Sequence, residues 1–170
     1  MNLRMMEIDA SNAALLSNFL YEAIFVPSGM QPPSKDILAD PQLQVYVQDF
    51  GKQTGDFGLF AEVEGVIAGA VWARIMEDYG HIDNETPSLA IALYKEYRGK
   101  GVGTALLQAM LKLLQEHGYE QVSLAVQKEN YAVKLYTACG FRVYRESEEE
   151  YIMVRSLRQN TACTSQEGAL

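Results

Sequence analysis

Cysteines and long apolar runs are both scarce in this sequence. The two cysteines, Cys139 and Cys163, show neither CxxC spacing nor a Cys/His cluster, so we expect free thiols, no disulfide framework and no metal site. The longest apolar run, residues 66–73, is too short to cross a bilayer, and charged residues interrupt the first twenty positions, unlike a secretory signal. We therefore expect a cytoplasmic protein that does not act at a membrane.

Positive charge is also in short supply. The chain has 14 Lys and Arg residues against 22 Asp and Glu residues, a net charge of −8, and no run that interleaves basic and aromatic residues. Nucleic acid is therefore excluded as the principal partner, whereas an anion can still bind where cations and backbone dipoles gather locally.

Length and composition predict one folded domain. The 170 residues are 48% hydrophobic and 21% charged, which is typical of a globular protein with a real core. We expect the domain to span residues 1–157 and residues 158–170 to form a flexible tail.

Apolar periodicity and turn residues predict the order of the elements. A strand at 3–8 precedes a helix that Ser11 caps, and short helices interrupted by Pro41 follow at 34–48. A hairpin turns at Glu64-Gly65, and an amphipathic helix with an apolar stripe at 102, 105, 106, 109, 110 and 113 ends at Gly118. The expected strands are 3–8, 57–63, 66–75, 88–93, 121–126, 141–144 and 151–155. Hairpins with one strand-helix-strand unit predict an α/β or α+β sheet.

A glycine-rich loop joins the expected strand 88–93 to the helix that begins at Val102. Such a junction presents unpaired backbone N–H groups at the positive end of the helix dipole, where an anion binds. Glycines let a diphosphate approach the main chain closely, and the cations beside them add charge. The loop residues are Arg98, Gly99, Lys100, Gly101, Val102, Gly103 and Thr104. A tight turn without a ligand is the alternative.

Two other phosphate-binding loops do not fit this segment. Counted from Gly99, the sixth position of a dinucleotide-binding GxGxxG pattern is Thr104, and the Gly-Lys-Ser/Thr ending of a P-loop is absent. A dinucleotide-dependent oxidoreductase is therefore a weaker alternative.

The segment Arg98 to Gly103 resembles the acetyl-CoA signature of the GNAT (Gcn5-related N-acetyltransferase) superfamily, Arg/Gln-x-x-Gly-x-Gly/Ala. The stretch from Asn130 to Tyr136, followed by Gly140-Phe141, is similar to the second CoA motif of that family, one helix and one strand further on. The resemblance is specific over about residues 85–145 and only architectural over residues 3–75.

The resemblance implies a mixed, mostly antiparallel twisted sheet flanked by helices, with acetyl-CoA between splayed fourth and fifth strands. The pantetheine would then bond to the exposed backbone of Ile91, Ala92 and Leu93, and Asn130 and Tyr136 would also contact the cofactor. Tyr136 matches the family's usual general acid, although it lies on an apolar stripe and has a core aromatic as its alternative role. Asn130 has a helix cap as its alternative role. Many members of the family form homodimers.

A catalytic base is the least defined part of the prediction. Glu85 lies thirteen residues before Arg98, which resembles the position of the catalytic glutamate in the histone acetyltransferase branch. Pro87 intervenes, so a solvated Glu85, Asp83 as the base, or a chain of water molecules are the alternatives.

These observations predict an N-acetyltransferase that transfers the acetyl group of acetyl-CoA to a primary amine by direct attack on the thioester. The amine belongs either to a small molecule or to a protein lysine or N-terminus, and the acidic balance mildly favours a cationic acceptor. The alternative is a CoA-binding regulatory module that performs no transfer, because a fold alone does not establish activity.

Overall fold

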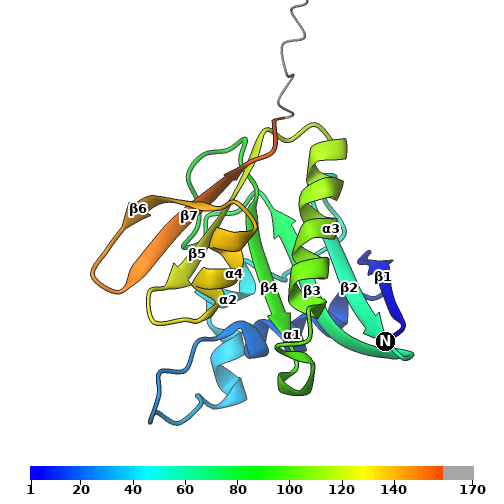
Figure 1. Ribbon diagram of the computed structural model, residues 1–170, viewed down its shortest axis with the longest axis horizontal. Coiled ribbons are helices and arrows are strands. Elements are labelled where there is room, and N and C mark those ends of the chain that lie inside the picture. The colour runs from blue at the N-terminus through cyan, green and yellow to red at the C-terminus, as the bar shows by residue number, and fades with distance from the viewer. Residues whose placement is uncertain (159–170) are drawn as a thin grey trace, which may run out of the picture.

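The computed structural model describes residues 1–158, and all of their strands join one seven-stranded mixed sheet with helices on both faces (Figure 1). The strand order is β1-β2-β3-β4-β5-β7-β6, and only β4 and β5 pair in parallel. The strands are β1 Leu3–Glu7, β2 Phe57–Val63, β3 Val66–Arg74, β4 Ser88–Leu93, β5 Gln121–Gln127, β6 Arg142–Glu146 and β7 Glu150–Ser156. The α-helices are α1 Leu16–Ala23, α2 Pro41–Gln44, α3 Val102–Glu116 and α4 Ala132–Ala138. The predicted fold class is confirmed.

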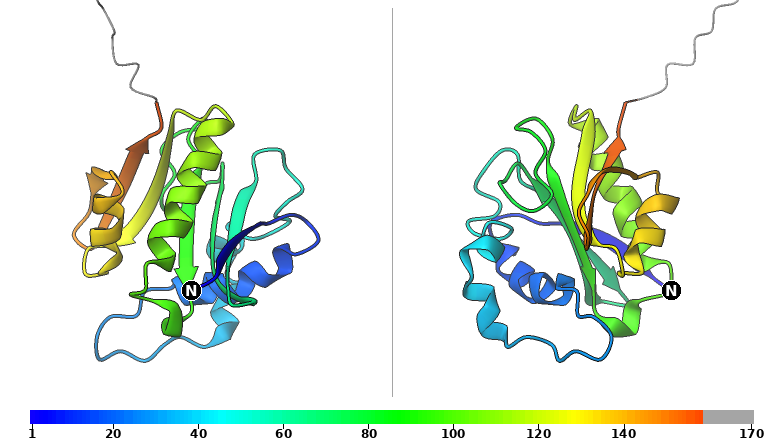
Figure 2. Two further views of the ribbon diagram at one scale, coloured as in Figure 1. Left: turned by 45° about the vertical axis from the view of Figure 1, so that its right-hand side comes forward. Right: turned by 90° about the vertical axis from the view of Figure 1, so that its left-hand side faces the viewer.

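The helices divide between the two faces of the sheet (Figure 2). Helix α3 packs on β2, β3 and β4, and α4 packs on β5, whereas α1 crosses β3 and β4 on the opposite face. Two apolar clusters, one on each face, form the core. The sheet therefore separates an α3/α4 face from an α1/α2 face.

The buried side of α3 is rotated from the predicted stripe. Its buried residues are Val102, Leu106, Leu107, Met110, Leu111 and Leu114. Three residues of the predicted stripe, Ala105, Ala109 and Leu113, are only partly buried. Apolar residues surround more than half of this helix, so periodicity alone does not fix its rotation. Each larger apolar side chain that becomes fully buried contributes roughly 1.5–3 kcal/mol, which favours the rotation that buries leucines over alanines.

The hairpin turn follows the expected chemistry, whereas the predictions for Ser11 and Pro41 at helix ends are wrong. Glu64 and Gly65 both have positive φ angles, 49° and 85°, as a tight hairpin turn requires. Ser11 does not cap a helix, because its hydroxyl donates to Asp9 and a 3₁₀ turn at Ala13–Leu15 precedes α1. Pro41 begins α2 rather than interrupting a helix, since proline needs no hydrogen-bond acceptor at the first helical position.

Side chains of β3 hold the irregular segment 45–48 against the α1/α2 face. The Trp72 indole donates to the carbonyl of Tyr46 at 3.0 Å, and the Arg74 guanidinium donates to the carbonyls of Val45 and Gln48. Arg74 also forms a buried ion pair with Asp56 at 2.9 Å. Trp72 and Arg74, two residues apart on β3, thus satisfy carbonyl groups of segment 45–48 that have no strand partner.

No helix within residues 1–158 is long and apolar enough to cross a membrane. The predicted tail, apart from Arg158, lies outside the described residues, as does Cys163. The domain boundary at residue 157 stays a prediction.

Candidate active site

Strands β4 and β5 separate soon after they begin. Their only register pair is Ser88 with Ser123, where the Ser123 N–H donates to the carbonyl of Pro87 at 3.0 Å. Beyond that point the two strands diverge toward their carboxyl ends (Figure 1). A gap therefore opens in the middle of the sheet.

One edge of the gap is backbone of β4 that has no strand partner. The Tyr94 N–H donates to the carbonyl of Ala68. Hydrogen-bonded pairs recur every second residue in this register, so Ala92 is hydrogen-bonded to its partner Ala70 in β3. Bonding directions alternate along an antiparallel strand, so the N–H and C=O groups of Ile91 and Leu93 face the gap. The structure thus directs two of the three predicted pantetheine contacts into the gap and pairs the third, Ala92, with β3.

The glycine loop lies at the end of β4 and has room for a ligand. Gly99 and Gly101 have φ angles of 71° and 83°, and a Cβ added to either would meet no atom within 4 Å. Gly101 precedes the first residue of α3, and no side chain caps that helix. The first N–H groups of α3 are therefore available to an anion, and the predicted cradle fits a diphosphate.

Gly103 has a different role from the other two glycines. A Cβ at this position would lie 3.1 Å from Cδ1 of Leu93 and 3.7 Å from Leu135. The missing side chain therefore lets α3 approach the end of β4 closely.

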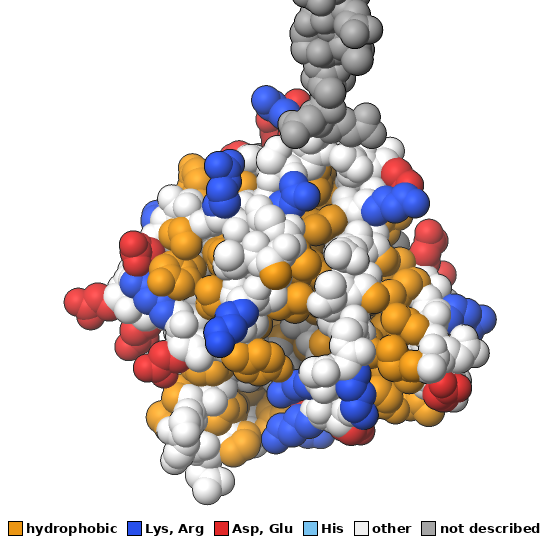
Figure 3. All heavy atoms as spheres, viewed as in Figure 1, with side chains coloured by type: hydrophobic (Ala, Val, Ile, Leu, Met, Phe, Trp, Pro, Cys, Tyr) orange, Lys and Arg blue, Asp and Glu red, His pale blue; other side chains and the backbone are white. Residues whose placement is uncertain are grey.

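The two cations of the loop do not act alike. The Arg98 Nε donates to the carbonyl of Leu93 at 3.0 Å, and its guanidinium pairs with Glu22 of α1 at 3.2 Å. Within residues 1–158, Lys100 forms no ion pair and is exposed. Figure 3 shows basic side chains near the start of α3, beside a recess in the surface. Lys100 is thus free to contact a phosphate, while Arg98 fastens the loop to α1 and β4.

Tyr136 of α4 is nearly buried, but its hydroxyl is not enclosed by the protein. The residue is 7% exposed and its ring packs against Phe141, with 5.8 Å between the ring centroids. Its hydroxyl makes no hydrogen bond within the described residues and is not among their fully buried polar atoms without a partner, so it is not completely shielded from solvent. Burial raises the pKa of Tyr136, which keeps the phenol protonated at neutral pH.

Asn130 acts as a helix cap. Its side-chain oxygen accepts a hydrogen bond from the N–H of Ala132, the first residue of α4, at 2.9 Å. The sequence-based alternative of a cap is therefore confirmed, and a contact between Asn130 and cofactor stays a prediction.

Glu85 lies in the exposed loop before β4, beyond the end at which β4 and β5 are still paired. Its N–H and that of Thr86 donate to the Asp83 carboxylate, and these bonds lower the pKa of Asp83. Asp83 therefore folds a local turn, and the structure does not bring Glu85 close to the glycine loop.

Sequence reasoning missed a polar group on the α1/α2 face of the gap. The Ser88 hydroxyl donates to Asp78 at 2.7 Å, and the Ser123 hydroxyl donates to the carbonyl of Gly80 at 2.7 Å. Burial, followed by the neighbouring Asp78 carboxylate, raises the pKa of Tyr46. Burial and then Asp78 likewise raise the pKa of Glu150, at the start of β7. These residues come from five separate segments, so no local motif marks them.

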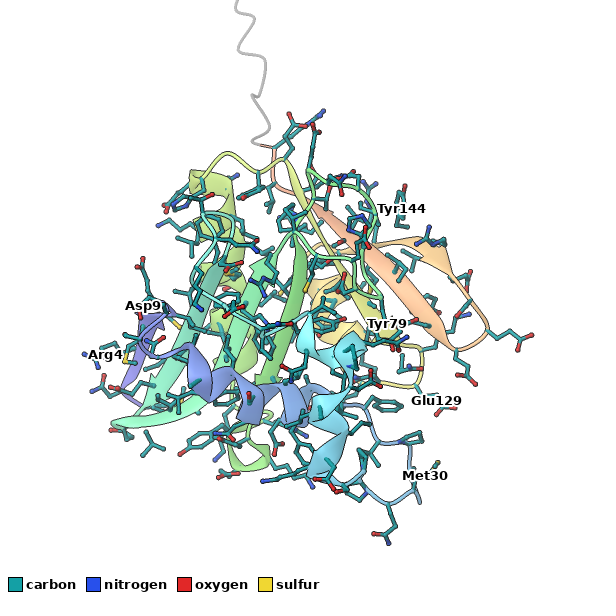
Figure 4. The ribbon with its side chains drawn as sticks, turned by 180° about the vertical axis from the view of Figure 1, so that it is seen from behind. Arg4, Asp9, Met30, Tyr79, Glu129 and Tyr144 are labelled. Carbon is teal, nitrogen blue, oxygen red and sulfur yellow. The ribbon has the colours of Figure 1, made fainter. Side chains whose placement is uncertain are left out.

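The loop that carries Asp78 lies over β5. A Cβ on Gly80 would approach the backbone N of Ala125 within 3.0 Å, and the Tyr79 hydroxyl donates to Gln42 of α2 at 2.6 Å. Seen from behind, Tyr79 lies between α2 and the β6–β7 hairpin (Figure 4). The loop and α2 thus form one wall beside the gap.

Comparison with known proteins identifies the family. The model of the acetyltransferase (GNAT) family matches residues 23–141. The chain belongs to the GNAT family. The acetyltransferase also has curated relatives, among them the N-alpha-acetyltransferase of Sulfurisphaera tokodaii, 34% identical over 57% of this chain and 67% of that protein. The N-alpha-acetyltransferase of Saccharolobus solfataricus is 31% identical over 64% of this chain and 75% of that protein.

A solved structure shares the fold. The PaiA N-acetyltransferase of Thermoplasma acidophilum, in complex with coenzyme A, superposes with a TM-score of 0.63 and 18% identity, over 92% of this chain and 99% of that chain. The predicted family, enzyme class and cosubstrate are confirmed: the protein is an acetyl-CoA-dependent N-acetyltransferase. The non-catalytic CoA-binding module is not favoured.

Proposed function

We propose that this acetyltransferase acetylates the α-amino group at the N-terminus of a peptide or protein. The observation that carries the proposal is the similarity to archaeal proteins named N-alpha-acetyltransferase, each at least 31% identical and covered over two thirds or more of its length. The carboxylates beside the gap add support, because a terminal amine is cationic at the moment it binds.

Residues of the α3/α4 face hold the cosubstrate in this proposal. The N–H groups at the start of α3, with Gly99 and Gly101, receive the diphosphate, and Lys100 adds a cation. The N–H and C=O of Ile91 and the N–H of Leu93 receive the pantetheine amides in place of the missing strand partner, since the Leu93 carbonyl accepts from Arg98. A β4 N–H close to the thioester would stabilise the oxyanion that forms during attack.

Tyr136 is the general acid of the proposal. The departing CoA sulfur needs a proton, and a phenol that stays protonated at neutral pH can donate one. The alternative, a core aromatic whose hydroxyl is satisfied by the protein, is disfavoured because that hydroxyl has no protein partner within residues 1–158 and is not completely shielded from solvent.

Free amino acids fit the acceptor side less well than peptides do. A free amino acid carries a carboxylate next to its amine, and Asp78 and Glu150 would repel that charge. In a peptide the same carbonyl is an uncharged amide. The electrostatics of the face therefore favour an N-terminal residue over a free amino acid.

Release of CoA thiol from acetyl-CoA tests the proposal. We expect release with peptides that have a free N-terminus, and none with the same peptides blocked at the N-terminus but carrying an internal lysine. Free amino acids and polyamines complete the panel. Turnover confined to the lysine peptides or to polyamines would contradict α-amine specificity, and the modified atom is identified by mass spectrometry.

Three further features of the proposal have their own tests. The cytoplasmic location is checked by fractionation of cells, and the expected homodimer by light scattering.

Glu85 stays a predicted base, although it is exposed and lies before β4, whereas the glycine loop follows the other end of that strand. Glu85→Gln should lower the maximal rate at neutral pH, with part of the loss recovered at higher pH, if Glu85 accepts the proton.

A further inference from the structure

Most partly buried carboxylates of this protein are neutralised by an arginine. Within residues 1–158, the acidic residues that are not fully exposed are Glu22, Asp56, Glu62, Asp78 and Glu150. The first three pair with Arg98, Arg74 and Arg4, at 3.2, 2.9 and 3.0 Å respectively. Asp78 and Glu150 form no ion pair in this part of the chain.

The two unpaired carboxylates influence each other. Burial and then Asp78 raise the pKa of Glu150, so the two carboxylates are close enough to repel each other. Lys128, whose backbone N–H donates to the carbonyl of Glu149, pairs its ammonium with Glu146 and lies over the Tyr151 ring at 5.1 Å. Two like charges that are each partly removed from water repel each other, and neither has an ion-pair partner within residues 1–158, so the arrangement favours a cation from outside the protein.

Their positions place them at the gap in the sheet. Asp78 accepts from Ser88, at the end where β4 and β5 are still paired, and Glu150 is the register partner of Gln127, at the open end of β5. In β7 the side chains alternate between faces, and Met153 and Tyr151 pack into the α3/α4 core. Glu150 therefore belongs to the α1/α2 face, opposite the face on which α3 begins.

The loop between β3 and β4 carries a second sign of an incomplete site. Nδ1 of His81 is the single buried side-chain nitrogen or oxygen within residues 1–158 that has no hydrogen-bond partner. The His81 N–H donates to the carbonyl of Asp78 at 3.3 Å, so the ring belongs to the same turn as Asp78. Buried polar atoms are normally satisfied, and a ligand or a water molecule would complete this one.

We infer that Asp78 and Glu150 bind the ammonium group of the acceptor on the α1/α2 face of the gap, and that one of them takes its first proton. The inference rests on the proposed function, because it gives the amine of that reaction its binding site. It also makes the two residues the main determinants of selectivity for a cationic acceptor.

The chemistry balances with these residues. The ammonium gives one proton to a carboxylate, and the neutral nitrogen attacks the thioester carbon to form the C–N bond. The C–S bond then breaks and the sulfur receives a proton from Tyr136. The carboxylate releases the first proton to solvent, and the nitrogen then loses its second proton to solvent through the same carboxylate. Solvent reprotonates Tyr136, so one proton is released for each acetyl group transferred.

Matched substitutions test the inference. Asp78→Asn and Glu150→Gln each remove one negative charge from the pair, while Glu77→Gln and Glu149→Gln remove one from the exposed neighbours. Initial rates are measured with the preferred acceptor of the wild type, varied at saturating acetyl-CoA, and then with acetyl-CoA varied. Thermal stabilisation by acetyl-CoA verifies that each variant is folded.

We expect each pair variant to lower kcat/KM for the acceptor by about tenfold to a hundredfold, since the carboxylates are only partly buried. The KM for acetyl-CoA should stay within about twofold, as should both constants of the control variants, because screening weakens exposed charges. Unchanged acceptor kinetics in a folded Glu150→Gln protein would overturn the inference even if Asp78→Asn failed to fold. A loss seen only in Glu85→Gln would also overturn it.

The same assay distinguishes failure of the proposed α-amine specificity from failure of the proposed ammonium site. If the wild type prefers a lysine side chain or a polyamine, α-amine specificity fails, and the pair variants are measured with that amine instead. If the wild type prefers free N-termini and the pair variants behave as wild type, the proposed function stands and the ammonium site fails. A wild type that releases no thiol with any amine would overturn both.

Discussion

The cosubstrate loop and the proposed acceptor site are assembled from the chain in different ways. The loop is one continuous segment, residues 98–104, between the end of β4 and the first turn of α3. The acceptor site combines Tyr46, Asp78, Ser88 and Glu150, which come from four segments spread over about a hundred residues of the chain. Local chemistry is sufficient for a diphosphate, whose partners are consecutive backbone N–H groups. Recognition of an amine needs side chains that only the folded sheet brings together.

The largest expected effect tests the chemistry between these two regions. Tyr136→Phe removes the proposed proton donor and keeps the ring that packs on Phe141. We expect kcat to fall by ~10² to 10⁴, with little change in the KM for acetyl-CoA, because general acid catalysis is typically worth that much. Steady-state kinetics measure the effect. Wild-type turnover in the folded variant would assign Tyr136 to the core alone.

The next effect tests the cosubstrate loop alone. Gly101 has a φ angle of 83° and open space where a side chain would lie. In Gly101→Val the new side chain occupies that space, where we expect the diphosphate. Loss of one or two charge-assisted hydrogen bonds should raise the KM for acetyl-CoA by about tenfold to a hundredfold. The left-handed backbone conformation adds a stability cost of roughly 1–2 kcal/mol.

Gly118→Val is the matched control for that substitution. Gly118 lies just beyond the other end of α3, has a φ angle of 85°, and also has no atom within 4 Å of an added Cβ. The two variants should lose similar stability in thermal melts, but only Gly101→Val should weaken acetyl-CoA binding. Equal binding by both would reduce Gly101 to a turn residue.

The smallest effect tests the acceptor region through stability. Burial, and then Asp78, raise the pKa of Glu150 above its ordinary 4.5, so its charged form is less favourable in the folded chain than in the unfolded chain. This cost is present at pH values above the raised pKa and vanishes below about 4.5, where the residue is protonated in both states. Glu150→Gln should therefore raise the Tm slightly at neutral pH, and the difference should fade on acidification.

Exposed Glu149→Gln is the control for the melting experiment. It should change the Tm little at any pH, because an exposed carboxylate has similar surroundings in both states. A Glu150→Gln protein that melts below the wild type at neutral pH would show that the carboxylate is stabilised in the fold, contrary to the expected sign. Acceptor kinetics of the same variant should decline while its stability rises.

The sequence predicted the elements whose causes are local. Gly101, Gly118 and Gly140 mark helix boundaries because each adopts a positive φ, and Glu64-Gly65 closes its hairpin for the same reason. The order of strand β4, glycine loop and helix α3 could therefore be predicted from the sequence. Rotation of α3 was not, because it depends on which of its many apolar residues meet the sheet.

Long-range contacts explain the rest of what the sequence could not give. Arg98 was expected beside a phosphate, yet its guanidinium lies on Leu93 and on Glu22, which is far away in the sequence. Asp78 and Glu150 belong to no motif that the sequence shows. The pattern of arginine pairing that distinguishes them from other carboxylates exists only in the folded chain.

The bonds from Trp72 and Arg74 to segment 45–48 have a consequence for selectivity. They fix the backbone around Tyr46 without a helix or strand, so this part of the wall is ordered before an acceptor arrives. Little conformational entropy then remains to be lost on binding, and the affinity of the amine is not reduced by the cost of ordering the segment. The position of segment 45–48 depends on the side chains of Trp72 and Arg74 in β3. Substitutions at these two positions can therefore change the shape of this segment while its own sequence stays the same.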